Sequence, residues 1–136
     1  MSFISGKCLC GNISYQSFAE PEFTANCHCT DCRAATGAVY STICFIKADQ
    51  LTINGKTKTF QHLSDRGNTM TKHFCPTCGS QLFGENTARN GMIGIRAGSI
   101  DQIDKIKPSR QVYISSRIPS TPIDSELPVS HRMPEN

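Results

Sequence analysis

The sequence predicts a single, mainly β domain built from small antiparallel sheets with very little helix. Three observations favour this fold class: short β-rich runs are separated by turn residues, helical periodicity is scarce, and 136 residues suit one modest core. We assign the domain to residues 1–118 and expect residues 119–136 to form a Pro-rich C-terminal extension. An apolar content of 38% excludes a disordered chain.

The first expected elements are two strands and one short helix. Ile13 and Tyr15 alternate with polar neighbours, and residues 39–46 form a nearly continuous β-rich run, so both segments are predicted strands. The best helical candidate is Thr30–Thr36, where a capping Thr or Asp and two alanines allow one or two turns.

Two chain reversals are expected further on. Asn54 and Gly55 both tolerate positive φ, which predicts a two-residue hairpin between residues 50–53 and 56–63. A second reversal is predicted at residues 64–68, and it leads into the strand candidate TMTKHF. The runs SQLFGE, GMIGIRAG and QVYIS supply the remaining strands.

The composition of the two ends and the charge limit the possible partners. Four of the seven prolines lie in residues 119–136, which predicts an extended strap or a frayed tail without catalytic residues. The N-terminal residues do not resemble a secretion signal, and no stretch is apolar enough to cross a bilayer. We therefore expect a cytoplasmic protein without a membrane partner.

A net charge of +3, from 14 basic and 11 acidic residues scattered along the chain, argues against a nucleic-acid partner.

Eight cysteines are the most informative feature of the composition. In a reducing compartment, clustered cysteines are more often metal ligands or catalysts than disulfides. Disulfides and simple buried or redox-active thiols stay as alternatives. By spacing, the cysteines fall into three groups and one solitary residue: Cys8 and Cys10; Cys27, Cys29 and Cys32; Cys75 and Cys78; and Cys44.

The spacing predicts one closed, structural zinc site. The run FCPTCGS is similar to a zinc knuckle, in which Pro76 opens a tight turn and two thiolates bind the ion. A knuckle supplies two ligands, so a second pair is needed. Cys8 and Cys10 are two residues apart on an extended segment and would complete a four-cysteine site.

The remaining group, Cys27, Cys29 and Cys32, would bind a second ion and leave its fourth position open. An open position distinguishes a catalytic zinc from a structural one. All-sulfur donors favour zinc, and an iron–sulfur cluster is the main competitor. Cys44 or His28 would alternatively close this site into a structural one, although Cys44 lies in an apolar strand where a free cysteine is ordinarily a core residue.

Four motifs, taken in order, resemble the glutathione-dependent formaldehyde-activating enzyme family, also called the centromere protein V family. They are GKCLCGNI at residues 6–13, CHCTDCRAATG at 27–37, FCPTCGS at 74–80 and RAGSID at 96–101. The resemblance implies a β-tent domain with two zinc ions per chain. It implies a structural zinc on Cys8, Cys10, Cys75 and Cys78, and a catalytic zinc on Cys27, Cys29 and Cys32. The chain departs from the family pattern in having no tryptophan, which the family often carries after the last core strand.

The family activity that the resemblance implies is formation of S-(hydroxymethyl)glutathione from glutathione and formaldehyde, formally a carbon-sulfur lyase reaction. Zinc on three thiolates suits a thiol substrate, because a soft site can hold the substrate sulfur as thiolate while it attacks an aldehyde carbon. Candidates for proton transfer are His28, Asp31 and His73, and Arg33 is a candidate clamp for a substrate carboxylate. An alternative for Arg33 is a bond to a backbone carbonyl.

Two other classes of function compete with this enzyme. A non-catalytic, zinc-stabilised binding or chaperone-like module is the main alternative, and a nucleic-acid-binding zinc ribbon is weaker because the basic residues are scattered. A zinc deaminase is excluded, because no cysteine or histidine is followed two residues later by the glutamate which that class requires. The oligomeric state is not predicted.

Overall fold

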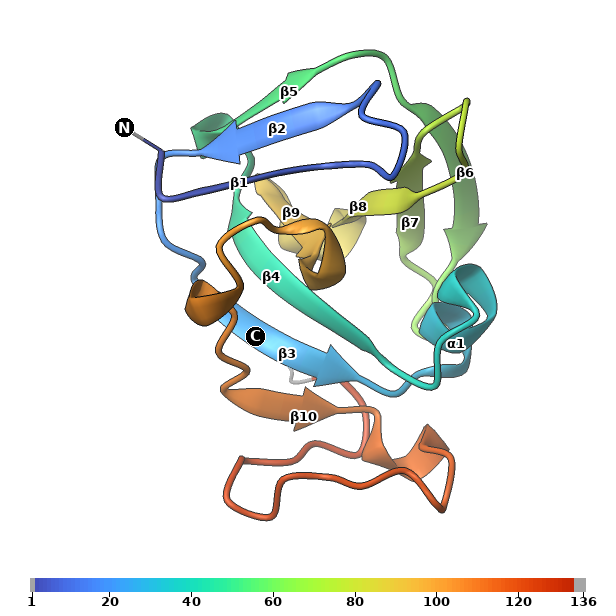
Figure 1. The fold of residues 1–136 in the computed structure, drawn as a ribbon. Helices are drawn as coiled ribbons and strands as arrows, with labels where there is room; N and C mark the ends of the chain where they lie inside the picture. The colour runs from blue at the N-terminus through green and yellow to red at the C-terminus, as the bar shows by residue number, and fades with distance from the viewer. Residues whose placement is uncertain (1, 134–136) are drawn as a thin grey trace.

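The computed structural model describes residues 2–133 and arranges them as two β-sheets with a shared core between them (Figure 1). The smaller sheet has the strand order β1 (Ile4–Lys7), β2 (Ser14–Ser17), β5 (Leu51–Asn54). The larger sheet has the order β10 (Arg110–Val112), β3 (Phe23–Cys27), β4 (Ser41–Lys47), β9 (Met92–Arg96), β8 (Gln81–Asn86), β7 (Thr69–Phe74), β6 (Lys58–Leu63).

Helix is a minor part of the fold, as predicted. The described residues contain one α-helix, α1 (Thr30–Thr36), and five three-residue 3-10 helices: Ala48–Gln50, Thr87–Arg89, Ala97–Ser99, Ile103–Lys105 and Ile114–Ser116. None of the helices in residues 2–133 is long and apolar enough to span a membrane. The prediction of a mainly β domain with very little helix is confirmed.

The larger sheet differs from the expected antiparallel arrangement at one edge. Strand β10 pairs in parallel with β3, so that Arg110 lies opposite Ala25 and Val112 opposite Cys27. Parallel neighbours need a long connection, and here almost the whole domain lies between the two strands in sequence. This pairing brings the segment after β10 beside the end of β3, where Cys27 lies.

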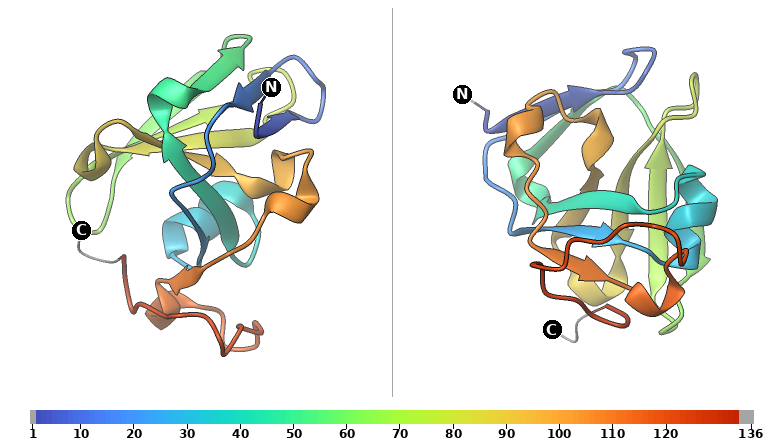
Figure 2. Two further views of the ribbon diagram at one scale, coloured as in Figure 1. Left: turned by 90° about the vertical axis from the view of Figure 1, so that its left-hand side faces the viewer. Right: turned by 60° about the horizontal axis from the view of Figure 1, so that its bottom comes forward.

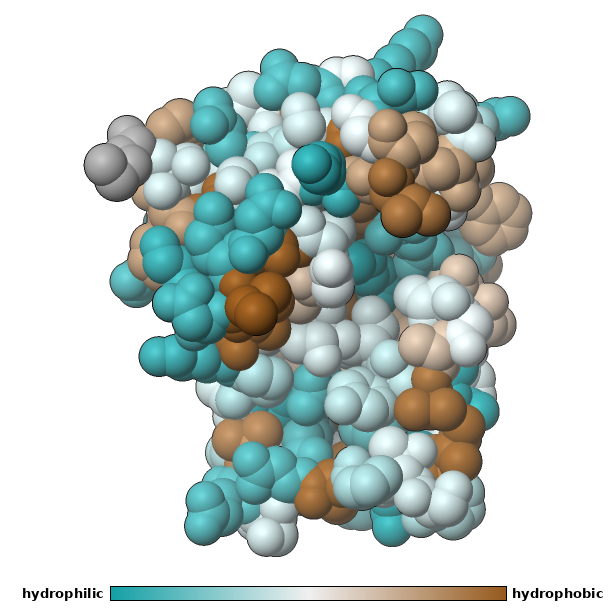
Figure 3. Space-filling model, in the orientation of Figure 1, coloured by the Kyte–Doolittle hydropathy of each residue, from teal (hydrophilic) through white to brown (hydrophobic). Residues whose placement is uncertain are grey.

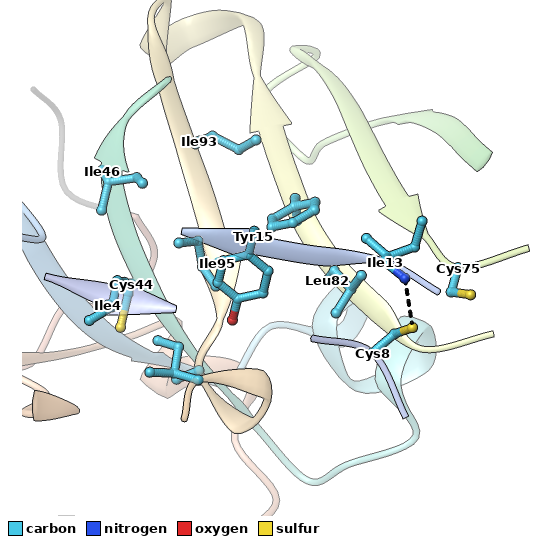
Figure 4. Packing of buried hydrophobic residues seen from close by; sticks show 13 residues of the cluster. Ile4, Cys8, Ile13, Tyr15, Cys44, Ile46, Cys75, Leu82, Ile93 and Ile95 are labelled. Carbon is cyan, nitrogen blue, oxygen red and sulfur yellow. Dashed lines mark hydrogen bonds between the residues drawn. The ribbon is translucent and has the colours of Figure 1, made fainter. Parts of the chain in front are cut away.

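The main core lies between the two sheets. Figure 4 shows the side chains of Ile4 and Tyr15 from the smaller sheet, and of Ile13 just before β2, packed towards those of β4, β8 and β9. The Tyr15 ring meets Phe83 edge-on, with the ring centroids 5.2 Å apart. Burial of this apolar surface stabilises the domain, because each fully buried large apolar side chain contributes roughly 1.5–3 kcal/mol.

A second, smaller cluster of buried residues lies on the face of the larger sheet that points away from the main core. It consists of Ala25, Cys27, Cys32, Ile43 and Val112. Successive residues of a strand point to opposite faces, so Ile43 joins this cluster whereas Cys44 points into the main core. The two faces of β3 and β4 therefore separate Cys44 from the Cys27 group.

Helix α1 has the predicted boundaries, but its N-cap differs from the prediction. The cap is Cys29, whose sulfur accepts a hydrogen bond from the backbone N–H of Cys32 at 3.1 Å, in place of Thr30 or Asp31. The helix ends at Gly37, which has a φ of 74°. A thiolate at this position accepts a helix N-terminal N–H, as an oxygen cap does.

The predicted hairpin at Asn54 and Gly55 is wrong. Strand β5 pairs with β2, whereas β6 pairs with β7, so the chain leaves the smaller sheet at this turn and enters the larger one. Gly55 has a φ of 101°, and a Cβ there would lie 2.5 Å from the carbonyl oxygen of Asn12. Glycine is therefore favoured at this position because two chain segments approach closely, and not because the chain forms a two-residue hairpin.

The second predicted reversal is confirmed. Leu63 and Thr69 form the last pair of β6 and β7, and the N–H of Ser64 donates to the carbonyl of Asn68 at 2.8 Å. Gly67 has a φ of 81°, which favours glycine at this turn.

The described part of the C-terminal extension is an extended strap. Both views in Figure 2 show it beside β10, where Gln111 pairs in parallel with Val129. The side chain of Gln111 also donates to the carbonyl of Asp124 at 2.7 Å and accepts from its N–H at 3.1 Å. On the face drawn in Figure 3, apolar residues form separate patches among polar ones.

Candidate metal centres and the adjoining cavity

The structure brings the eight cysteines together as two clusters and one solitary residue. In the first cluster the sulfur atoms of Cys8, Cys10, Cys75 and Cys78 all lie within 4.8 Å of one another. In the second, the sulfurs of Cys27, Cys29 and Cys32 meet the same limit. Both groups are those that the spacing predicts.

Two tight turns form the first cluster. After β1, the N–H of Gly11 donates to the carbonyl of Cys8, and after β7 the N–H of Gly79 donates to the carbonyl of Cys75. The N–H groups of Ile13 and Thr77 point at the two buried sulfurs, at 3.3 Å from Cys8 Sγ and 3.4 Å from Cys75 Sγ. Figure 4 shows the first of these bonds. Such N–H groups stabilise thiolates, as a metal site requires.

The second cluster is formed where β3 runs into α1. Cys27 is the last residue of the strand, Cys29 caps the helix, and Cys32 lies in its first turn. The change from strand to helix within six residues turns all three thiols towards one point. Cys27 and Cys32 are each only 6% exposed.

A buried arginine contacts this second cluster. The guanidinium of Arg96 donates from Nη1 to Ser41 Oγ at 2.9 Å and lies 3.6 Å from Cys32 Sγ. Its Nε has no hydrogen-bond partner among the described residues, although the side chain is buried. Hydrogen bonds from Cys27 and Cys29, together with the charge of Arg96, lower the pKa of the Cys32 thiol well below its usual range.

A cavity of about 520 Å³ opens beside the second cluster and is lined by all three of its cysteines. Lys72 and Arg96 reach it from β7 and β9, and Arg132 and Met133 reach it from the C-terminal strap. Its volume falls in the range of small-molecule sites, roughly 300–1,000 Å³. The first cluster does not line this cavity.

The donor sets fit zinc at both clusters. Four sulfurs make a closed shell, whereas three sulfurs beside a cavity leave room for a further ligand. Cys44 is in neither cluster. Its sulfur accepts a hydrogen bond from Thr24 Oγ1 at 3.4 Å inside the main core. In this structure Cys44 therefore does not close the three-cysteine site.

The residues predicted to assist catalysis lie in different places. Asp31 lines the cavity, and its carboxylate lies 3.9 Å from His62 Nδ1. His28 does not line the cavity: its buried ring packs against Tyr40, with the centroids 4.9 Å apart, and its Nδ1 has no described partner. Burial, together with the charges of Arg117 and Arg33, lowers the pKa of His28.

Arg33 and His73 also point elsewhere. The guanidinium of Arg33 donates to the carbonyl of Ser116 at 3.2 Å and does not line the cavity, which is the backbone contact weighed as its alternative. His73 contacts Glu85 at 2.7 Å through Nε2 and Thr57 at 3.1 Å through Nδ1. It too lies outside the lining of the cavity beside the cysteines.

Sequence reasoning missed three residues of the site, Arg96, Lys72 and His62. The signal for two of them was present in strand alternation. Lys72 shares a strand face with Met70, and Arg96 shares one with Met92, and both charged residues are buried. A charged residue at an inward strand position is a candidate functional residue.

Comparison with known proteins bears on the family and the fold. A family profile described as "Glutathione-dependent formaldehyde-activating enzyme" matches residues 3–116. A crystal structure of a Rhodobacter sphaeroides protein is similar in fold, with a TM-score of 0.55 and 20% sequence identity. The similarity covers 72% of this chain and 88% of that one. Because the profile matches most of the chain, including both cysteine clusters, the protein belongs to the glutathione-dependent formaldehyde-activating enzyme family.

Proposed function

We propose that the protein is a zinc-dependent enzyme of the carbon-sulfur lyase type that joins a small thiol to an aldehyde. The observation that supports this proposal is the 520 Å³ cavity lined by Cys27, Cys29 and Cys32, a cluster with three ligands rather than four. Glutathione and formaldehyde are the substrate pair to which the family name points.

We propose two zinc ions per chain, one at each cluster. Cys8, Cys10, Cys75 and Cys78 would hold the structural ion, and Cys27, Cys29 and Cys32 the catalytic one. When bound at the three-cysteine cluster, zinc supplies a soft Lewis acid that favours the thiolate form of a substrate thiol.

The chain's own residues bind and orient the substrates in this proposal. The cavity holds both reactants near the cysteines, so their reaction gains from proximity. Of the candidates His28, Asp31 and Arg33, Asp31 is the best placed, because it lines the cavity. Arg33 and His28 would have to leave their present contacts to reach a substrate.

The test is a screen of thiol and aldehyde pairs by NMR exchange spectroscopy, with the same pairs in free solution as the reference. The zinc-loaded protein is expected to accelerate adduct formation and breakdown, and Cys29→Ser to abolish that acceleration. Cys44→Ala is the matched control, since Cys44 is a buried thiol outside both clusters. No acceleration with any pair would favour a non-catalytic, zinc-stabilised binding module.

A further inference from the structure

A lysine and a histidine from neighbouring strands meet at the wall of the cavity. In the pairing of β6 with β7, Lys72 lies opposite Phe60 and His62 opposite Met70, so Lys72 and His62 are diagonal neighbours. Lys72 Nζ lies 2.6 Å from His62 Nε2. The Lys72 side chain is buried, and His62 is half-buried.

The hydrogen bonds of His62 indicate which atoms carry a proton in its contact with Lys72. Its Nδ1 lies 3.2 Å from the carbonyl oxygen of Leu63, which can only accept, so Nδ1 carries a proton. The short contact then contains one proton in either of two forms. Either the Lys72 ammonium donates to a neutral imidazole, or an imidazolium donates to a neutral Lys72 amine.

The surroundings of Lys72 favour exchange between these forms. Among the described residues, no carboxylate lies within ion-pair distance of Lys72. The charged or titratable groups around it are His62 on β6, Arg96 on β9, and Asp31, Cys29 and Cys32 at α1. Burial lowers the pKa of Lys72, and the charge of Arg96 lowers it further, against an opposite effect of the thiols and Asp31.

The pair also faces the place where a substrate would react. Lys72 and His62 both line the cavity that the three cysteines line. With Asp31 they also line a second cavity of about 500 Å³. The carboxylate of Asp31 faces Nδ1 of His62 at 3.9 Å.

We propose that Lys72 and His62 form the proton-transferring pair of the thiol and aldehyde reaction, with Lys72 as the group that contacts the substrate oxygen. The thiol sulfur forms the new C–S bond to the aldehyde carbon, and the C=O π electrons move to oxygen. That oxygen takes the proton shared by Lys72 and His62. The proton lost from the thiol returns to the pair, so the cycle gains or loses none.

This inference rests on the proposed function and deepens it. The test compares the rate above the free-solution reaction for the zinc-loaded wild type, Lys72→Met and His62→Gln. General acid–base catalysis contributes about 10²–10⁴-fold, so Lys72→Met is expected to lower kcat at least about 100-fold, with KM changed less. Lys58→Met is the matched control, since Lys58 is an exposed lysine on β6 outside the lining of the cavity.

The pH profile supplies a second readout. The wild-type rate is expected to fall as rising pH removes the shared proton, at a pH below that at which an exposed lysine titrates, about 10.4. This alkaline limb is expected to be lost in Lys72→Met, whereas ionisation of the substrate thiol affects both proteins equally. His62→Gln is expected to retain the limb at a shifted pH.

A third readout does not depend on activity. The ¹³Cε resonance of Lys72, assigned by its loss in Lys72→Met, is expected to titrate at lower pH than that of Lys58 and to shift in His62→Gln. Two results would refute the role of Lys72 and His62 but leave the proposed function intact. One is an active wild type together with a Lys72→Met variant that keeps its full rate, and the other is titration of Lys72 at the same pH as Lys58. A wild type inactive on every substrate pair refutes the proposed function and, with it, the catalytic role of the pair.

Discussion

The two cysteine clusters consist of the same residue type but have different surroundings. The four-cysteine cluster joins two tight turns next to the main core, and its buried sulfurs face backbone N–H groups. The three-cysteine cluster lies at the junction of a strand and a helix, where Arg96 approaches one sulfur and a cavity borders all three. The comparison shows that the two clusters share their residue type and differ in the number of cysteines and in the space beside them, which are the features that distinguish open from closed zinc sites.

The largest expected effect concerns the four-cysteine cluster. Cys75→Ser removes a fully buried thiol of the cluster at which the turn after β7 meets the one after β1, which is the proposed structural zinc site. Binding of a structural zinc contributes roughly 10–16 kcal/mol to folding, so loss of a ligand is expected to destabilise the domain by more than about 4 kcal/mol. Circular dichroism during urea unfolding measures this change, and near-wild-type stability would contradict a structural role.

A smaller effect on folding is expected at the three-cysteine cluster. Cys29→Ser removes one ligand but leaves a good helix cap, because a serine oxygen also accepts the Cys32 N–H. We expect the metal content to fall from two ions to one, with a loss of stability of about 1–2 kcal/mol. Metal analysis and the same unfolding assay test this. If this variant unfolds as fully as Cys75→Ser, both clusters are structural.

The smallest expected effect concerns Arg96, whose positive charge lies beside the three-cysteine cluster. Arg96→Met removes the guanidinium that lies 3.6 Å from Cys32 Sγ. Because partners of metal ligands typically contribute 10–100-fold to affinity, we expect binding at the three-cysteine cluster to weaken by about that factor. Competition with a chelator measures it, with the four-cysteine cluster of the same protein as the internal control. Equal weakening at both clusters would show a general loss of folding.

The sequence was sufficient for features that depend on local spacing. The three-cysteine cluster, the helix Thr30–Thr36 and the turn before Thr69 follow from residues close together in the chain, and the two distant cysteine pairs were matched by the number of ligands that a closed zinc site needs. Sheet membership was not predictable in this way, because β5 finds its partner in β2 across a long stretch of sequence. Asn54 and Gly55 permit a hairpin, but the close approach of Gly55 to Asn12 depends on tertiary packing.

The same reasoning explains which site residues were missed. Asp31 was found because it lies between two cysteines, whereas Lys72 and Arg96 reach the cavity from strands far along the chain. Their inward position follows from strand alternation, but which cluster they face depends on the strand order of the sheet. His28 shows the converse, because proximity in sequence to two ligands did not place its ring in the cavity.

The path of the C-terminal strap has a practical consequence for biochemical work on this protein. Met133 lines the cavity, and its carbonyl accepts a hydrogen bond from Arg66 at 2.9 Å, so the described part of the strap ends beside the three-cysteine cluster. Imidazole groups are common metal ligands, so a polyhistidine purification tag is better kept off this strap. Recombinant protein for metal analysis is therefore better prepared with a cleavable tag ahead of Met1.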